Sequence, residues 1–487
     1  MPQNENVTLH ELQSSSPDIR EQNPDGPDPA QDVFHEPSTD RNYTRQNNSY
    51  RTRYYVLIGS AILQLPIWGN ACFAMSYGVF QEYYYENWTL DGSRAQTGII
   101  GTTQNGVMYL SMPFLFALFT KRWARWRQTA ALCGTVLACL SFILSSFSTN
   151  VWHLIVTQGV MAALGCALIY SPMTLSLGEW FQARTSNQGA VNRAVAYGVV
   201  LSSKNIVGST CPFLFRGLLD HYDFPATLRI WTALLGGTCL LGIALIPTHP
   251  SSMPNSSRTH RTPKIPWHFL RHKTFYIYSI AIIFQSAGYG IPQTYINQYG
   301  KEITMLSQTW ATLLLTLFNV PGIIASSFFG YLSDNKLFPL SAATVASIPP
   351  VSSACSAFLL WGLTSQGSGG LALLILFSIT FGFFSSGYSA TWGGFLNELE
   401  REAAQANEAI DAGMMYGLLN GARGIGYVSG GFASVPLLRA GSGFSGKFAY
   451  GTTFGPLIIF TGLTSVLGGC VLIRKWEKQL LRIFDFA

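Results

Sequence analysis

One stretch near the middle of the chain, THPSSMPNSSRTHRTPKIPWHFLRHK at residues 248–273, decides how the rest of the sequence is divided. It is polar and basic, and it is the longest such connection between apolar runs. On each side of it we count six apolar runs of about 20 residues, the length that crosses a ~30 Å bilayer core as a helix. Two equal sets of helices joined by such a linker predict a transporter built from parallel repeats.

The composition supports a membrane protein. Of the 487 residues 48% are hydrophobic and only 11% are charged, whereas soluble domains carry about 25% charged residues. We therefore predict an all-α membrane protein with twelve transmembrane helices in two six-helix, pseudo-symmetric halves. The expected spans are 54–80, 97–119, 128–147, 152–175, 190–214, 229–247, 274–297, 308–332, 339–363, 369–392, 413–438 and 450–473.

The remaining segments complete the domain plan. The first 50 residues are rich in Asn, Gln, Asp, Pro and Ser, a composition that cannot bury enough apolar surface to fold alone and that predicts a disordered tail. The plan is a tail at 1–50, a first half at 51–247, a linker at 248–273, a second half at 274–473 and a short tail at 474–487.

Lysine and arginine counts predict the orientation. With the N-terminus in the cytoplasm, the inside segments hold 22 of these residues and the outside segments hold six. Positive residues collect on the cytoplasmic side of membrane proteins, so we expect a multi-pass protein with both termini cytoplasmic, in the plasma membrane. The sequon Asn87-Trp88-Thr89 then lies outside and is a predicted glycosylation site. The other sequons, which lie inside and should stay unmodified, begin at Asn6, Asn42, Asn47 and Asn255.

The sequence lacks the motifs of several functional classes. The chain has no nucleophile elbow, no P-loop, no HExxH and no paired-carboxylate site, so we predict no enzyme activity and no pumping by ATP hydrolysis. Its cysteines and histidines show no metal or redox spacing, and we expect no cofactor and no metal. The basic residues behind the net charge of +6 lie at the ends of the apolar runs, so this charge does not indicate nucleic-acid binding. The expected partners are a small organic solute and the lipid bilayer, with the protein as a monomer.

Acidic residues are missing from the interior of the predicted spans. Of the 24 Asp and Glu, nine lie in the first 53 residues, and the nearest candidate for a membrane carboxylate is Glu82, at the outer end of the first span. A proton relay normally needs an intramembrane carboxylate or histidine. The sequence therefore predicts that transport depends only weakly on a proton gradient.

Two cations, in contrast, lie deep inside spans. Lys204 is in YGVVLSSKNIVGSTCPFLF (197–215) and Arg423 is in ARGIGYVSGG (422–431). A charge at the bilayer centre costs about 2.5–3.5 kcal/mol on insertion scales, and an anionic solute would offset that cost. The alternatives are that Arg423 is a tether to backbone carbonyls, and that Lys204 is neutral and held by Asn205 or Ser203.

Two loops carry the resemblance to a known family. GYLSDNKLFP (330–339) and FALFTKRWARWRQ (116–128) fall at equivalent places in the two halves. They resemble the G-x-L-x-D-R-x-G-R-R loops of the major facilitator superfamily. Within it the chain is similar to the monocarboxylate-porter-like branch, especially its fungal members. The segments that carry this likeness are SYGVFQEYY (76–84), QGVMAALGCALIYSP (158–172), GEWFQARTSNQGA (178–190) and ARGIGYVSGG (422–431).

The chain also departs from that branch. Its first span opens with RTRYYVLIG (51–59), where the branch has an acidic D-G-G-W-G-W element, and LTLFNVPGIIASSFFG (315–330) lacks the Asp and Arg of the proton-coupled carriers. These departures bear on the substrate and leave the implied fold untouched.

The resemblance implies a set of site residues. It places Lys204 and Arg423 on helices that face the cleft between the halves. Spans 1, 4 and 7 also line that cleft, and their polar residues Asn70, Gln158, Gln285 and Tyr289 are expected substrate contacts. By the same resemblance Asp334 and Arg184 belong to loop elements that latch helices during gating. The aromatic run GFFSSGYSATWGGF in the tenth span fits either helix packing or the wall of a site for a large flat solute.

These observations predict a secondary transporter that moves a small organic solute by alternating access. An organic anion or secondary metabolite, moved outward, is the expected cargo. Uptake of a monocarboxylate or vitamin is the first alternative, and a solute sensor that does not transport is the second.

Overall fold

The fold is taken from a computed structural model. It describes residues 51–70, 79–80, 83–84, 91, 97–120, 123–181, 193–247, 268–334, 340–365, 368–408, 410–441, 443 and 446–472. Nearly all of these residues are helical, and the single β-bridge among them joins Asp91 to Asn150. The all-helical prediction is therefore confirmed for the described part of the chain.

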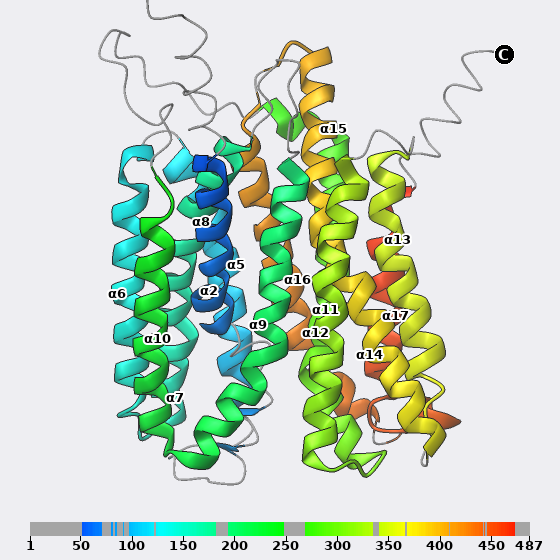
Figure 1. The fold of residues 1–487 in the computed structure, drawn as a ribbon. Helices are drawn as coiled ribbons and strands as arrows, with labels where there is room; N and C mark the ends of the chain where they lie inside the picture. The colour runs from blue at the N-terminus through cyan, green and yellow to red at the C-terminus, as the bar shows by residue number, and fades with distance from the viewer. Residues whose placement is uncertain are drawn as a thin grey trace, which may run out of the picture. The chain divides into compact units, whose positions relative to one another are not determined.

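The helices before the linker run side by side (Figure 1). Residues 51–62 are helical and lead into α2 (Gln64–Asn70). The others are α5 (Thr97–Thr120), η2 (Ala124–Trp126), α6 (Arg127–Ser145), α7 (Val151–Leu154), η3 (Ile155–Met161), α8 (Ala162–Trp180), α9 (Arg193–His221) and α10 (Phe224–Ala244).

The helices from the end of the linker onward follow the same pattern of long elements and short connections. They are η5 (His268–Arg271), α11 (Lys273–Glu302), α12 (Gln308–Asp334), α13 (Ala342–Cys355), η6 (Ser356–Trp361), α14 (Ser368–Tyr388), η7 (Ser389–Thr391), α15 (Trp392–Gln405), α16 (Ala412–Gly441), η8 (Phe448–Gly451) and α17 (Gly455–Gly468). Figure 1 shows α15 reaching beyond the ends of the helices around it.

The described helices fall on the predicted runs. The run expected at 97–119 is α5, and the run expected at 308–332 is α12. Six helices in the described residues are long and apolar enough to cross a membrane by length and composition. The count of twelve spans stays a prediction.

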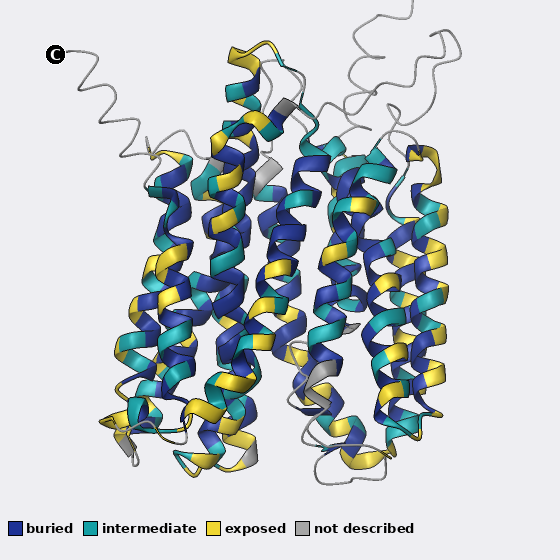
Figure 2. Ribbon diagram, turned by 180° about the vertical axis from the view of Figure 1, so that it is seen from behind, coloured by how far each residue is buried: buried dark blue, intermediate teal, exposed yellow. Residues whose placement is uncertain are grey.

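Helix α6 shows how the sequence separates a lipid face from a packed face. Large apolar side chains at Leu132, Val136 and Leu140 are exposed, while small residues such as Gly134 and Ala138 are buried. Small residues let helices approach closely in a bilayer, where lipid covers the apolar side chains outside. Figure 2 shows the same alternation of exposed and buried residues on the outer helices.

The two halves meet along two helix pairs. Between α9 and α12, the Asn205 amide donates to the Gly322 carbonyl at 2.8 Å and Ser202 Oγ donates to the Ile323 carbonyl at 2.6 Å. Between α5 and α16, a Cβ at Gly424 would lie 2.8 Å from the Cβ of Tyr109, so only glycine allows this approach. These two seams join α9 to α12 and α5 to α16.

Some predicted features lie outside the described residues. They are the tails at 1–50 and 474–487, the linker up to residue 267, Glu82, Arg184 and the sequon at Asn87. Asn70 and Asp334 are the last residues of α2 and α12, and their side chains also lie outside the description.

Candidate functional site

Lys204 is buried in the middle of α9, with 5% of its surface exposed. Its Nζ lies 4.2 Å from the ring centroid of Trp68 on α2. Within the described part of the chain it has no hydrogen bond and no ion pair. Asn205, the expected local partner, donates instead to Gly322 and Ser326 of α12. The arrangement leaves a buried ammonium with one aromatic face and no acceptor among the described residues.

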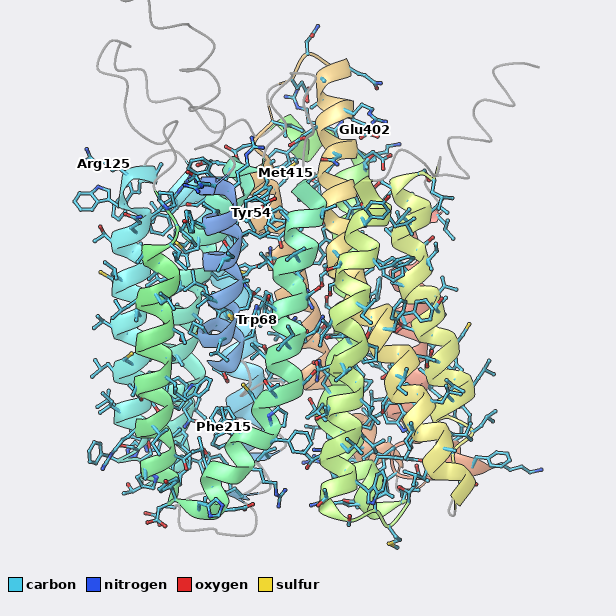
Figure 3. The ribbon with its side chains drawn as sticks, in the orientation of Figure 1. Tyr54, Trp68, Arg125, Phe215, Glu402 and Met415 are labelled. Carbon is cyan, nitrogen blue, oxygen red and sulfur yellow. The ribbon has the colours of Figure 1, made fainter. Side chains whose placement is uncertain are left out.

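Trp68 is itself held in place. Its Nε1 donates to Gln64 Oε1 at 2.6 Å, and Gln64 Nε2 donates to the Ser60 carbonyl at 2.9 Å, so the ring is fixed along one side of α2. Figure 3 places Trp68 about half-way along the helices, whereas Arg125 and Glu402 lie at one end. The fixed ring offers its negative face to the ammonium.

Arg423 occupies an aromatic cage in the middle of α16. Its Cζ lies 5.5–5.7 Å from four ring centroids, those of Tyr109, Tyr289, Trp392 and Tyr427. Nη1 donates to Ser389 Oγ at 2.6 Å, and Nη2 donates to the Tyr427 hydroxyl at 3.3 Å. The guanidinium is thus held by hydroxyl groups and rings rather than by the backbone carbonyls of the tether hypothesis.

Three buried polar atoms around Arg423 have no hydrogen-bond partner among the described residues. They are Arg423 Nε, the Tyr109 hydroxyl and Trp392 Nε1. Most buried polar atoms in folded proteins are paired, and an unpaired one needs an explanation. All three can donate a hydrogen bond. A ligand with acceptor oxygens would satisfy them.

The charge of this region is positive and unbalanced in the described residues. Lys204 and Arg423 come from opposite halves, and the contacting rings of Trp68 and Tyr109 link them. None of the ion pairs within the described residues includes either residue. Buried charges are normally paired, so an anion is the species that would complete this arrangement.

The other predicted substrate contacts lie in different surroundings. Tyr289 is part of the Arg423 cage. Gln285 lies on the α17 side of α11, where it packs against Gly468. Gln158 is fully buried on η3, and neither amide atom has a partner in the described chain. No hydrogen bond or ring contact in that part links Gln158 to Lys204 or Arg423.

A pocket of about 270 Å³ opens at the end of the bundle where α5 and α8 end and α16 begins. Its lining includes Phe116, Tyr197, Leu396, Glu179 and Asp411, which come from both halves.

A group of tyrosines lies between this pocket and the two cations. Tyr416 of α16 stacks on Tyr197 at 5.1 Å between centroids, and its hydroxyl lies 3.3 Å from that of Tyr170 on α8. On its other side Tyr416 contacts the Trp392 ring, a member of the Arg423 cage, at 6.0 Å. The tyrosines therefore separate the pocket from the cations.

Two side-chain pairs at the same end of the bundle connect neighbouring elements. Arg127 at the start of α6 forms two hydrogen bonds with Glu179 of α8, at 2.7 and 2.8 Å. His272 Nε2 lies 2.9 Å from Glu408 Oε2. Sequence reasoning missed both pairs, because 52 and 136 residues separate their members.

Of the rings around the cations, Tyr289 was among the predicted substrate contacts, whereas Trp68, Tyr109, Trp392 and Tyr427 were not. Tyr427 follows Arg423 by four residues, which places both on one face of a helix. Trp392 belongs to the aromatic run of the tenth predicted span, which fitted either packing or the wall of a site for a flat solute. Trp68 and Tyr109 carried no such signal, since aromatic residues inside spans are more often simple packing.

The sequence model of one protein family, the Major Facilitator Superfamily, matches residues 57–431 of the chain. The chain belongs to the major facilitator superfamily. It is therefore a multi-pass membrane transporter, and the family by itself does not specify the substrate.

Known relatives confirm the resemblance to fungal and monocarboxylate-porter-like members. An MFS-type transporter of Gibberella moniliformis is 27% identical over 319 residues, covering 64% of this chain and 70% of that protein. One of Aspergillus niger is 22% identical, covering 80% of this chain and 82% of that protein. Monocarboxylate transporter 12 of Homo sapiens is 24% identical, covering 65% and 63%.

A solved structure confirms the fold. The crystal structure of the nucleoside transporter NupG matches with a TM-score of 0.57 and 14% identity, covering 87% of this chain and 98% of that one. At this identity the likeness concerns the fold alone.

Proposed function

We propose that this transporter moves a small organic anion out of the cytoplasm by alternating access. The observation that carries the proposal is the pair of buried cations, Lys204 and Arg423, on α9 and α16, with no carboxylate partner in the described chain. A cation that faces a solute path is stabilised while the anion is bound, and this difference between the empty and loaded states gives selectivity for charge.

Alternating access fits the way the halves meet. A rocking motion of the halves would part the tyrosine layer of Tyr170, Tyr197 and Tyr416, because Tyr416 belongs to one half and the other two belong to the opposite half. The cations would then become reachable from the pocket, which the charge counts place on the cytoplasmic side. A pocket open on that side supports loading from the cytoplasm.

Two alternatives remain. A monocarboxylate cargo, moved inward in the first alternative, is favoured by the likeness to monocarboxylate transporter 12, whose name states that cargo and no direction. A sensor that binds solute without moving it would use the same cations. Flux separates the classes, because a sensor binds but does not transport.

The test uses the purified full-length protein in sealed liposomes loaded with benzoate or with its neutral amide, benzamide. We expect benzoate to leave protein-containing liposomes faster than protein-free ones, and benzamide to leave both at the same rate. Equal acceleration of both solutes would overturn the anion proposal. Binding of benzoate without any accelerated flux would favour the sensor.

The predicted topology has its own test. Enzymatic deglycosylation of the protein from a eukaryotic host should increase its gel mobility, and Asn87→Gln should abolish that change, because Asn87 heads the one sequon that the charge counts place outside. Asn255→Gln, in the linker, is the control and should leave the mobility change intact. A change that survives in Asn87→Gln would contradict the orientation.

The coupling prediction follows from the missing intramembrane acids. We expect solute accumulation in vesicles at fixed external pH to change little, within about twofold, when a protonophore is added, since no carboxylate or histidine lies well inside a predicted span. Collapse of accumulation would contradict this. Glu82→Gln would then be the first variant to measure.

A further inference from the structure

The two cations are connected by aromatic rings. Lys204 lies against Trp68, and Trp68 lies 5.9 Å from Tyr109 between centroids. Tyr109 stacks on Tyr427 at 5.4 Å with 11° between the ring planes, and both rings face Arg423. A continuous aromatic wall, which we define as Trp68, Tyr109 and Tyr427, thus runs from one cation to the other and draws on both halves.

The route from the pocket to this wall is also aromatic. Phe116 and Tyr197 line the pocket, Tyr416 contacts both, and Trp392 follows between Tyr416 and Arg423. A solute that enters from the pocket therefore meets ring faces until it reaches the cations.

Polar groups beside the aromatic wall indicate where a bound solute would carry its oxygen atoms. Arg423 Nε, the Tyr109 hydroxyl and Trp392 Nε1 are buried without partners in the described chain, and all are donors. A carboxylate offers only acceptors and would satisfy them. The remaining body of the solute would lie along the rings, where a flat π system gains about 0.5–1.5 kcal/mol per ring pair beyond the burial of its area.

We propose that the solute is a planar, conjugated carboxylate, an aromatic acid in the simplest case, whose ring lies on Trp68, Tyr109 and Tyr427 while its carboxylate pairs with Lys204 or Arg423. This inference rests on the proposed function, because it takes the solute to be an anion. It adds that the planar ring of the solute contributes to the binding free energy separately from the charge of its carboxylate.

Three probes with one carbon skeleton separate the two contributions. They are 2-naphthoate, which is planar and charged, decahydro-2-naphthoate, which is charged but not planar, and 2-naphthamide, which is planar but neutral. Binding to the full-length protein in detergent would be followed by the rise in its thermal midpoint with ligand concentration. We expect 2-naphthoate to bind about 2- to 12-fold more tightly than decahydro-2-naphthoate, the range that one aromatic pair gives, and much more tightly than 2-naphthamide.

Variants of Trp68 tie the ring effect to the wall. Trp68→Leu should bring the ratio between the two acids close to one while keeping the preference for acid over amide. Trp68→Phe should restore most of the ratio, which a merely structural loss at this position would not do. The control is Trp152→Leu on the exposed surface of α7, which should leave every ratio unchanged.

The outcomes distinguish this inference from the proposed function. Equal affinity of the two acids, with the amide weaker, would overturn the ring inference and leave the anion proposal standing. Equal affinity of acid and amide would overturn the anion proposal. Failure of all three probes to bind at millimolar concentration would overturn the inferred class, while the charge requirement would still be decided by variants of Lys204.

Discussion

Replacing Lys204 with methionine is expected to weaken solute binding by about 2–5 kcal/mol, the range seen when one partner of a desolvated charge pair is lost. This corresponds to about a 30-fold to several-thousand-fold rise in the dissociation constant. The solute-free protein should be at least as stable as before, because Lys204 has no hydrogen bond or ion pair in the described chain and an apolar side chain is cheaper to bury there.

Binding and thermal stability of the empty protein should therefore change independently. Lys204→Arg should keep part of the affinity, and less of it if the compact ammonium is needed against Trp68. Lys447→Met is the matched control, since Lys447 is exposed next to η8 and is in none of the contacts around Lys204 and Arg423. Wild-type affinity in a well-expressed Lys204→Met protein would contradict the role of Lys204 in binding the anion.

Much of the fold was predictable from the sequence, because the bilayer imposes strict rules. Apolar runs of about 20 residues must become helices, since no other local structure satisfies the backbone in lipid. The predicted run at 97–119 and α5 agree within one residue, and 308–332 and α12 agree within two. The structure departs from the expectation at helix ends, as in α9, which continues to His221 past the predicted residue 214.

The cations of the candidate site were predictable for a related reason. A charge inside an apolar run costs free energy, so Lys204 and Arg423 stand out without any structure. Tyr289 was predicted as a contact on a cleft-lining helix, and it lies in the cage. Gln285 was predicted on the same grounds and lies against Gly468 of α17, and its role as a substrate contact stays a prediction.

The aromatic surroundings of the cations could not be predicted in the same way. Aromatic residues cost nothing inside a bilayer, so Trp68 and Tyr109 look like ordinary packing until their distances to the cations are known. The gating roles of Arg184 and Asp334 stay a prediction from the resemblance, because both side chains lie outside the described residues. The contacts that the structure describes at that end of the bundle are Arg127 with Glu179 and His272 with Glu408.

Removing the Glu179 side chain is expected to cost about 3–5 kcal/mol of stability, because it breaks the pair in which the buried Arg127 forms two hydrogen bonds with that carboxylate. Arg127 also donates from Nε to the Phe119 carbonyl at 3.0 Å, so the pair ties the end of α5 to α6 and α8. The matched control is Asp220→Ala, which removes the exposed partner of Arg216 within α9 and should cost about 0.5 kcal/mol or less. Denaturant titration of each variant in one detergent would measure the difference.

The double variant Arg127→Met/Glu179→Leu distinguishes a lost charge pair from a lost side chain. Apolar replacement of both partners is often close to neutral, whereas breaking the pair is not, so the double variant should recover most of the stability that Glu179→Ala loses. Equal stability losses in Glu179→Ala and Asp220→Ala would show that the pair adds nothing beyond a surface contact. The pair also bears on transport, because Glu179 lines the pocket that leads to the cations. Arg127→Met takes a positive charge away from that carboxylate on the pocket wall, and it should slow the entry of an anion more than that of its neutral amide.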